Sequence, residues 1–90
     1  MNDEETGIRY ALHLPGEIAS LPKAQETMTA WAGQCGFAED RSFQWQLVLS
    51  EALTNAVRHG SPRGSESRVG IHFDVMPGEQ VLSVHQEGPG

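Results

Sequence analysis

Two polar side chains, Glu51 and Asn55, are separated by four positions in the stretch SEALTNAVRHG, residues 50–60. In a helix this spacing places them one turn apart on the same face. A carboxylate and an amide oxygen in this arrangement can bind Mg²⁺ directly or through waters, and the carboxylate can orient a nucleophile. The simpler interpretation is a solvated face opposite an apolar stripe, and spacing alone does not exclude it.

The element expected to position these residues is an amphipathic helix over residues 40–59. Asp40 or Ser42 can cap its start, Gly60 suits the left-handed position after its end, and Pro62 prevents its continuation. Arg58 falls on the face of Glu51 and Asn55, with His59 close beside them. The opposite face is predicted to be buried, and its apolar residues are Phe43, Trp45, Leu49, Ala52, Leu53, Ala56 and Val57.

The remaining pattern predicts one more helix and three strands. Residues 8–14, 69–75 and 81–86 have the period-two alternation of strands, and the last two are joined by the turn Met76-Pro77-Gly78-Glu79. Residues 18–35 have helical spacing, with Ser20 as N-cap and Pro22 at the first helical position. The order strand, helix, helix, strand, strand indicates an α+β fold, a two-layer sandwich in which two helices cover one face of a sheet.

Composition limits the partners of this single domain. Of its 90 residues 12 are acidic and 6 basic, which gives a net charge of −6, and Lys and Arg do not cluster. Binding to nucleic acid or to an anionic membrane is therefore not expected. There is one cysteine, Cys35, and no signal peptide or long apolar span is visible, so we expect a cytoplasmic protein.

The four histidines show no metal-ligand spacing along the chain. His13, His59, His72 and His85 are each isolated in the sequence. We therefore expect them to be ordinary surface or strand residues.

Residues 49–60, LSEALTNAVRHG, resemble the N-box of the GHKL (Bergerat-fold) ATPases, the superfamily that includes gyrase and the histidine kinases. The sequence of this stretch is most similar to that of the anti-sigma-factor serine kinases of bacterial partner-switching systems. The resemblance implies ATP and Mg²⁺ as cofactors, Glu51 as the catalytic carboxylate and Asn55 as the metal ligand. It also makes Arg58 and His59 candidates for contact with the nucleotide phosphates.

The family's first glycine motif, Asp-x-Gly-x-Gly, aligns with Gln86-Glu87-Gly88-Pro89-Gly90. The resemblance implies nucleotide contacts by Gln86, Gly88 and Gly90, but glutamine replaces the aspartate that binds the adenine amino group. Strand alternation places Gln86 on the face of Leu82 and Val84, toward the helices. Its neutral amide can still accept a hydrogen bond, at a cost of about 1–3 kcal/mol in nucleotide binding.

The family's ATP lid and second glycine motif follow this point, and the chain does not contain them. We therefore expect residues 8–90 to be a truncated histidine-kinase-like ATPase domain, the N-terminal part of the fold. Residues 1–7 are acidic and polar, and we expect them to be a disordered N-terminus. A domain with part of its core uncovered is expected to dimerise, to swap segments or to be a fragment of a longer protein, and of these we favour a homodimer.

Three functions remain open at this point. The first is an ATP-dependent serine/threonine kinase domain that binds a sigma factor and phosphorylates an antagonist protein, with the 90 residues alone weakly active or inactive. The second is a degenerate, non-catalytic interaction module on the same fold, which the glutamine at position 86 favours. The third is the ATPase domain of a sensor histidine kinase, although no phosphoacceptor helix precedes it.

Overall fold

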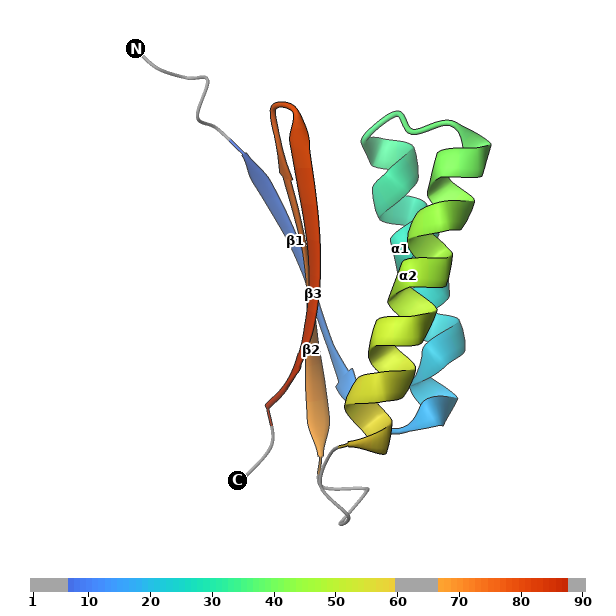
Figure 1. Cartoon of the computed structure of the whole chain (residues 1–90), viewed down its shortest axis with the longest axis vertical. Coiled ribbons are helices and arrows are strands. Elements are labelled where there is room, and N and C mark those ends of the chain that lie inside the picture. Colours follow the sequence, from blue (N-terminus) through green and yellow to red (C-terminus); the bar gives the residue numbers. More distant parts are fainter. Residues whose placement is uncertain (1–6, 60–66, 88–90) are drawn as a thin grey trace.

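The computed structural model describes residues 7–59 and 67–87, and it has two layers, a sheet and a pair of helices (Figure 1). The order of elements confirms the predicted α+β sandwich. Those elements are β1 (Ile8–Pro15), a short 3-10 helix (Ile18–Ser20), α1 (Leu21–Gln34), α2 (Glu39–Arg58), β2 (Arg68–Met76) and β3 (Glu79–Gln86).

The sheet is antiparallel in the order β1-β2-β3, so β2 is the central strand. Phe73 on β2 lies between Tyr10 on β1 and Leu82 on β3. The β2–β3 hairpin turns at Gly78, whose φ of 79° is in the left-handed region that suits glycine. This register sends one set of alternating side chains toward the helices and the other set to the opposite face.

The core lies between the sheet and the helices, and Phe73 is at its centre. The Phe73 ring is fully buried, with the Trp45 ring centroid at 4.9 Å and the Tyr10 centroid at 6.3 Å. Leu49 and Leu53 of α2 are also fully buried. The other buried apolar residues are Ala24, Met28, Trp31, Ala32, Val69 and Ile71.

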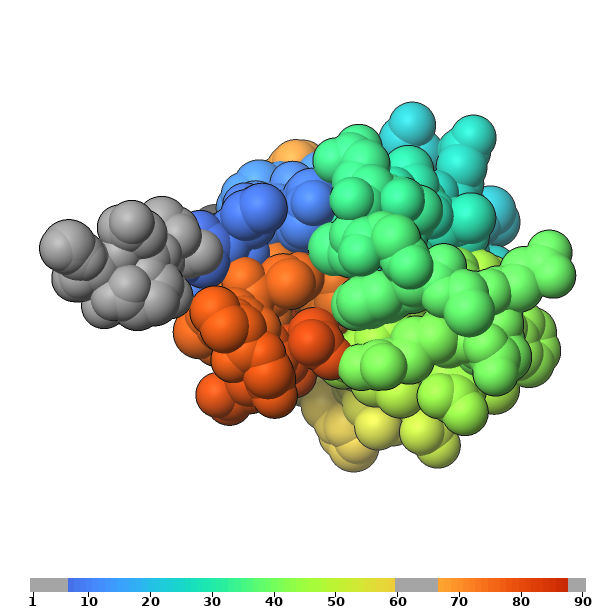
Figure 2. Space-filling model, turned by 90° about the horizontal axis from the view of Figure 1, so that it is seen from above, coloured from blue at the N-terminus to red at the C-terminus, as the bar shows by residue number. Residues whose placement is uncertain are grey.

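The helices pack against one side of the strands, as the view from above shows (Figure 2). No helix or strand of the described residues covers the other side, which we call the outer face of the sheet. On it Arg9 forms an ion pair with Asp74, with Nε and Oδ1 2.7 Å apart. This contact lowers the pKa of Asp74 below its usual range, chiefly because the guanidinium donates hydrogen bonds to the carboxylate.

The start of α2 differs from the prediction. The helix begins at Glu39 with Ala38 as N-cap, and no side chain caps it, so the assignment of Asp40 or Ser42 to that role is wrong. Glu39 and Asp40 instead place acidic groups in the first turn, where the helix dipole favours them. Phe43 is also 58% exposed, so its assignment to the buried face is wrong.

The N-terminal end of α1 is closer to its prediction. Ser20 is the N-cap, but its hydroxyl donates to the carbonyl oxygen of Pro15 at 2.7 Å and caps no helix N–H. Pro22 is the second residue of the helix, one position later than predicted. Gly60 and Pro62, the predicted stop signals of α2, lie outside the described residues.

Candidate functional site

An open depression of about 670 Å³ lies on the side of α2 that faces away from the core. It brings together three of the predicted site residues, Glu51, Asn55 and Arg58. The other residues that line it are Leu47, Ser50 and Thr54. Leu47, Glu51, Thr54 and Arg58 follow each other at intervals of four, three and four, the spacing of one helical stripe.

Contacts on both sides of α2 fix the direction of this stripe. Leu49 and Leu53 are completely buried against the sheet and α1, which sets the rotation of the helix about its axis. Gln25 of α1 donates a hydrogen bond from Nε2 to Ser50 Oγ at 2.7 Å, and that hydroxyl donates to the carbonyl oxygen of Gln46 at 2.9 Å. Glu51 and Asn55 are therefore held outward, where both are exposed.

The depression combines an acidic, a neutral and a basic group along two turns of helix. The carboxylate of Glu51 and the amide oxygen of Asn55 are oxygen ligands of the kind that Mg²⁺ prefers. Arg58, in the last turn, can form bidentate hydrogen bonds with a phosphate. The donor set thus fits a divalent cation together with an anionic ligand, and His59 follows as the exposed C-cap of the helix.

Gln86 approaches α2 from the sheet. It is the last residue of β3 and lies on the helix-facing side of the strand, where its Nε2 donates to the carbonyl oxygen of Ala56 at 3.3 Å. Ala56 directly follows Asn55, so the end of β3 meets α2 beside the depression without lining it. Gly88 and Gly90 lie outside the described residues.

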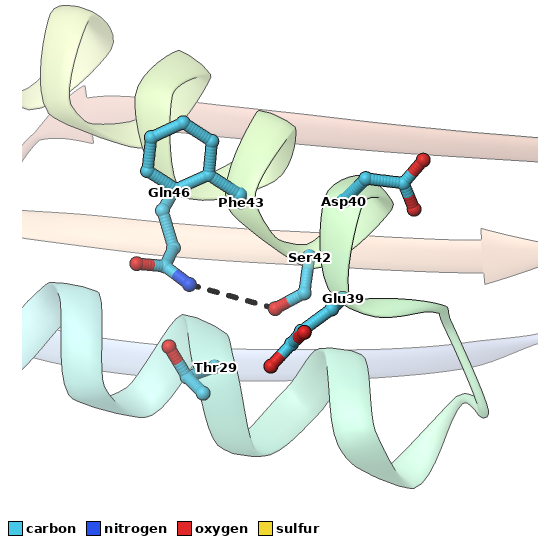
Figure 3. Close-up of a pocket in the computed structure, with 6 residues that line it drawn as sticks. All are labelled: Thr29, Glu39, Asp40, Ser42, Phe43 and Gln46. Carbon is cyan, nitrogen blue, oxygen red and sulfur yellow. Dashed lines mark hydrogen bonds between the residues drawn. The ribbon is translucent and has the colours of Figure 1, made fainter.

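A second depression at the N-terminal end of α2 has different chemistry (Figure 3). Glu39 and Asp40 lie at its edge, and Gln46 donates a hydrogen bond to Ser42 at 3.5 Å. No Lys or Arg side chain is among its lining residues, so its two carboxylates would repel a phosphate. The depression around Glu51 is therefore the better candidate for an anionic ligand.

Sequence reasoning did not single out Ser50 and Thr54 as lining residues. Both are small hydroxyl residues inside the stretch that carries Glu51 and Asn55, and Thr54 belongs to the same helical stripe. Extending the stripe from Glu51 by three residues would have found Thr54. Ser50 is recognisable only from its contact with Gln25 of α1, which the sequence does not indicate.

Comparison with known proteins identifies the family. The sequence profile of the histidine kinase-like ATPase domain family matches residues 14–90 of this chain. The chain belongs to the histidine kinase-like ATPase family. The matched residues include both helices, α1 and α2, and the β2–β3 hairpin.

A curated relative of this ATPase-like domain is the anti-sigma F factor of Halalkalibacterium halodurans. The two proteins are 33% identical over 67 residues, which is 74% of this chain and 46% of the relative. The chain thus spans about half the length of the curated relative it matches. Among the described residues, no helix is long and apolar enough to cross a membrane.

Proposed function

We propose that this chain is the ATP-binding part of an anti-sigma-factor-like protein serine/threonine kinase. The observation that carries the proposal is the convergence of Glu51, Asn55 and Arg58 in one open depression of a histidine kinase-like ATPase domain. An acid, an amide and a guanidinium on one helical face match the needs of a Mg²⁺-bound nucleotide, which presents both a hard cation and anionic phosphates.

Each residue has a distinct part in this proposal. Asn55 binds Mg²⁺ through its amide oxygen, and Arg58 and His59 contact phosphate oxygens. Glu51 orients the acceptor hydroxyl as general base. ATP would supply the transferable phosphoryl group and Mg²⁺ would neutralise part of its charge. The protein's own residues would position the phosphates and the acceptor hydroxyl.

Gln86, Gly88 and Gly90 form the base-binding end of the proposed site. The Gln86 amide donates to the Ala56 carbonyl, which leaves its Oε1 available to accept a hydrogen bond from the adenine amino group. A neutral amide makes a weaker bond than a carboxylate there. We therefore propose ATP binding that is weaker than with aspartate at position 86.

The proposed partners follow from the relative. The relative is an anti-sigma F factor, and by analogy we propose that this protein binds a sigma factor and phosphorylates an antagonist protein on serine. The proposal includes a homodimer in the cytoplasm. Binding to nucleic acid or to membranes is not part of it.

Calorimetric titration of ATP with Mg²⁺ into the chain tests the nucleotide site. We expect Asn55→Ala to abolish the dependence of ATP affinity on Mg²⁺, because the metal loses its amide ligand. The matched control is Glu39→Gln, an exposed position on the same helix in the acidic depression, which is expected to leave affinity unchanged. Equal affinity of the wild type and Asn55→Ala at every Mg²⁺ concentration would contradict the proposed role.

The second candidate function is a non-catalytic interaction module, and the neutral Gln86 favours it. The discriminating variant is Gln86→Asp, which restores a carboxylate and is expected to tighten ATP binding by roughly one or two powers of ten. The same variant is measured in a longer chain that includes the downstream sequence. If neither form binds ATP while the sigma factor is still bound, the interaction module is the correct function.

A further inference from the structure

Three of the four histidines meet on the outer face of the sheet, and each comes from a different strand. His13 of β1 and His85 of β3 both pair with Gly70 of the central strand, so they flank it in one row. His72 is two residues further along β2 and projects from the same face. Its ring centroid lies 4.9 Å from that of His85 and 6.1 Å from that of His13.

Gly70 provides the space in which these side chains meet. A Cβ atom at this position would lie 2.6 Å from Glu87 Oε2 and 3.0 Å from His85 Nε2. Both side chains therefore lean over the glycine, and a larger residue there would displace them. The missing side chain at this position of the central strand thus leaves room for one imidazole and one carboxylate directly above the backbone.

Glu87 determines which nitrogen of His13 remains free. Its carboxylate lies 2.9 Å and 3.1 Å from His13 Nδ1, and an ionised carboxylate only accepts hydrogen bonds. Nδ1 must therefore carry the proton, and in the neutral ring the lone pair is on Nε2. A histidine whose second nitrogen donates to a carboxylate is the usual arrangement of a metal-bound imidazole.

The ring separations suit coordination of one ion. Two imidazoles on one Zn²⁺, with Zn–N distances of about 2.0–2.1 Å and a tetrahedral angle, have centroids roughly 5 Å apart. The His72–His85 separation of 4.9 Å has this value, and the His13–His72 separation of 6.1 Å exceeds it by about 1 Å. In their present orientations, no three His, Cys, Asp or Glu side chains of the described residues form a ready ligand set, so the rings must rotate to bind.

We propose that His13, His72 and His85 form a binding site for a divalent transition metal ion of the Zn²⁺ type. His13 binds through Nε2, one ring nitrogen each of His72 and His85 complete three protein ligands, and water occupies the fourth position. Glu87 is a positioning residue that orients His13. The site lies on the face opposite to α2, so it does not depend on the proposed nucleotide function.

Calorimetric titration of Zn²⁺ into the metal-free chain at pH 7.5 tests this site. We expect one Zn²⁺ per chain in the wild type and no binding of comparable affinity in His72→Gln, which lacks the central ligand. Glu87→Gln keeps all three imidazoles, and the loss of its orienting carboxylate is expected to weaken binding by about 10–100-fold. His59→Gln removes the histidine outside the cluster and should bind Zn²⁺ as the wild type does.

Circular dichroism of each metal-free variant shows whether it has folded, and the exposed outer face tolerates these changes better than the core. Should His72→Gln fail to fold, Glu87→Gln carries the test alone. Unchanged Zn²⁺ affinity in the folded variants would overturn the proposal. So would loss of the site on His59→Gln or on Cys35→Ser, because the metal would then be bound elsewhere.

Discussion

Single side chains on the outer face show how local contacts set the chemistry of this small domain. Arg9 and Asp74 pair across β1 and β2, and the guanidinium lowers the pKa of the Asp74 carboxyl. Because the folded-state pKa is depressed, the pair stabilises the protein at neutral pH, and this contribution is lost as pH falls through that pKa. Arg9 is exposed and Asp74 is only half-buried, so solvent screens the pair and its effect on stability is small.

Replacing Arg9 by Gln should return the pKa of Asp74 toward its usual range. The free energy of unfolding of the variant should fall less than that of the wild type between neutral and acidic pH. The reason is that the variant lacks the ion pair whose contribution disappears when Asp74 is protonated. Carboxyl titration by NMR measures the pKa directly, and Lys23→Gln, an exposed cation on α1, is the control. An Asp74 pKa that is identical in the two proteins would show that the ion pair does not persist in solution.

At the scale of elements, the buried side of α2 fixes the rotation of the helix, and its exposed side carries the residues of the proposed nucleotide site. The helices and strands were predicted from periodicity, and so was the helix-facing position of Gln86; the turn at Gly78 was predicted from its residue types. A helical wheel assigned Phe43 to the core, but it cannot show how far the neighbouring elements extend. At this end of α2 the sheet and α1 cover Trp45 and leave Phe43 exposed.

Leu53 is expected to matter for stability far more than Leu47 on the same helix. Leu53 is fully buried and Leu47 is 54% exposed. Leu53→Ala should therefore lower the free energy of unfolding by about 2–5 kcal/mol, since it leaves a cavity under the helix. Leu47→Ala is the matched control, with an expected change within about 0.5 kcal/mol. Urea denaturation compares them, and equal losses would contradict the assignment of the buried side.

At the scale of the whole molecule, contacts between residues that are distant in the sequence could not be predicted. Alternation predicts that His13, His72 and His85 lie on strand faces, but only the register brings them together. That register depends on pairings between residues about 60 positions apart, such as His13 with Gly70. The same limit applies to Glu51 and Asn55: their helical face was predictable, whereas the contact of Gln25 with Ser50 beside them was not.

A metal bound by one histidine from each strand should stabilise the entire sheet. At a Zn²⁺ concentration 100 times the dissociation constant, binding to the folded state adds about 2.7 kcal/mol to the free energy of unfolding. For a domain of this size the expected rise in Tm is roughly 10–20 °C. Thermal melting followed by circular dichroism measures it. EDTA should reverse the rise, and Gly70→Ala should reduce it because the added Cβ would displace Glu87 and His85. A rise that survives EDTA would point to another cause.

Gln86 and Glu87 are neighbours in the chain, but their side chains project to opposite faces of the sheet. The first donates to the carbonyl oxygen of Ala56 on the helix side, and the second contacts His13 on the outer side. Between them is a single peptide unit, and the Glu87 amide is itself tied to the Arg68 carbonyl at 2.8 Å. The two surfaces of the sheet are therefore joined at this point by a single peptide unit of the backbone.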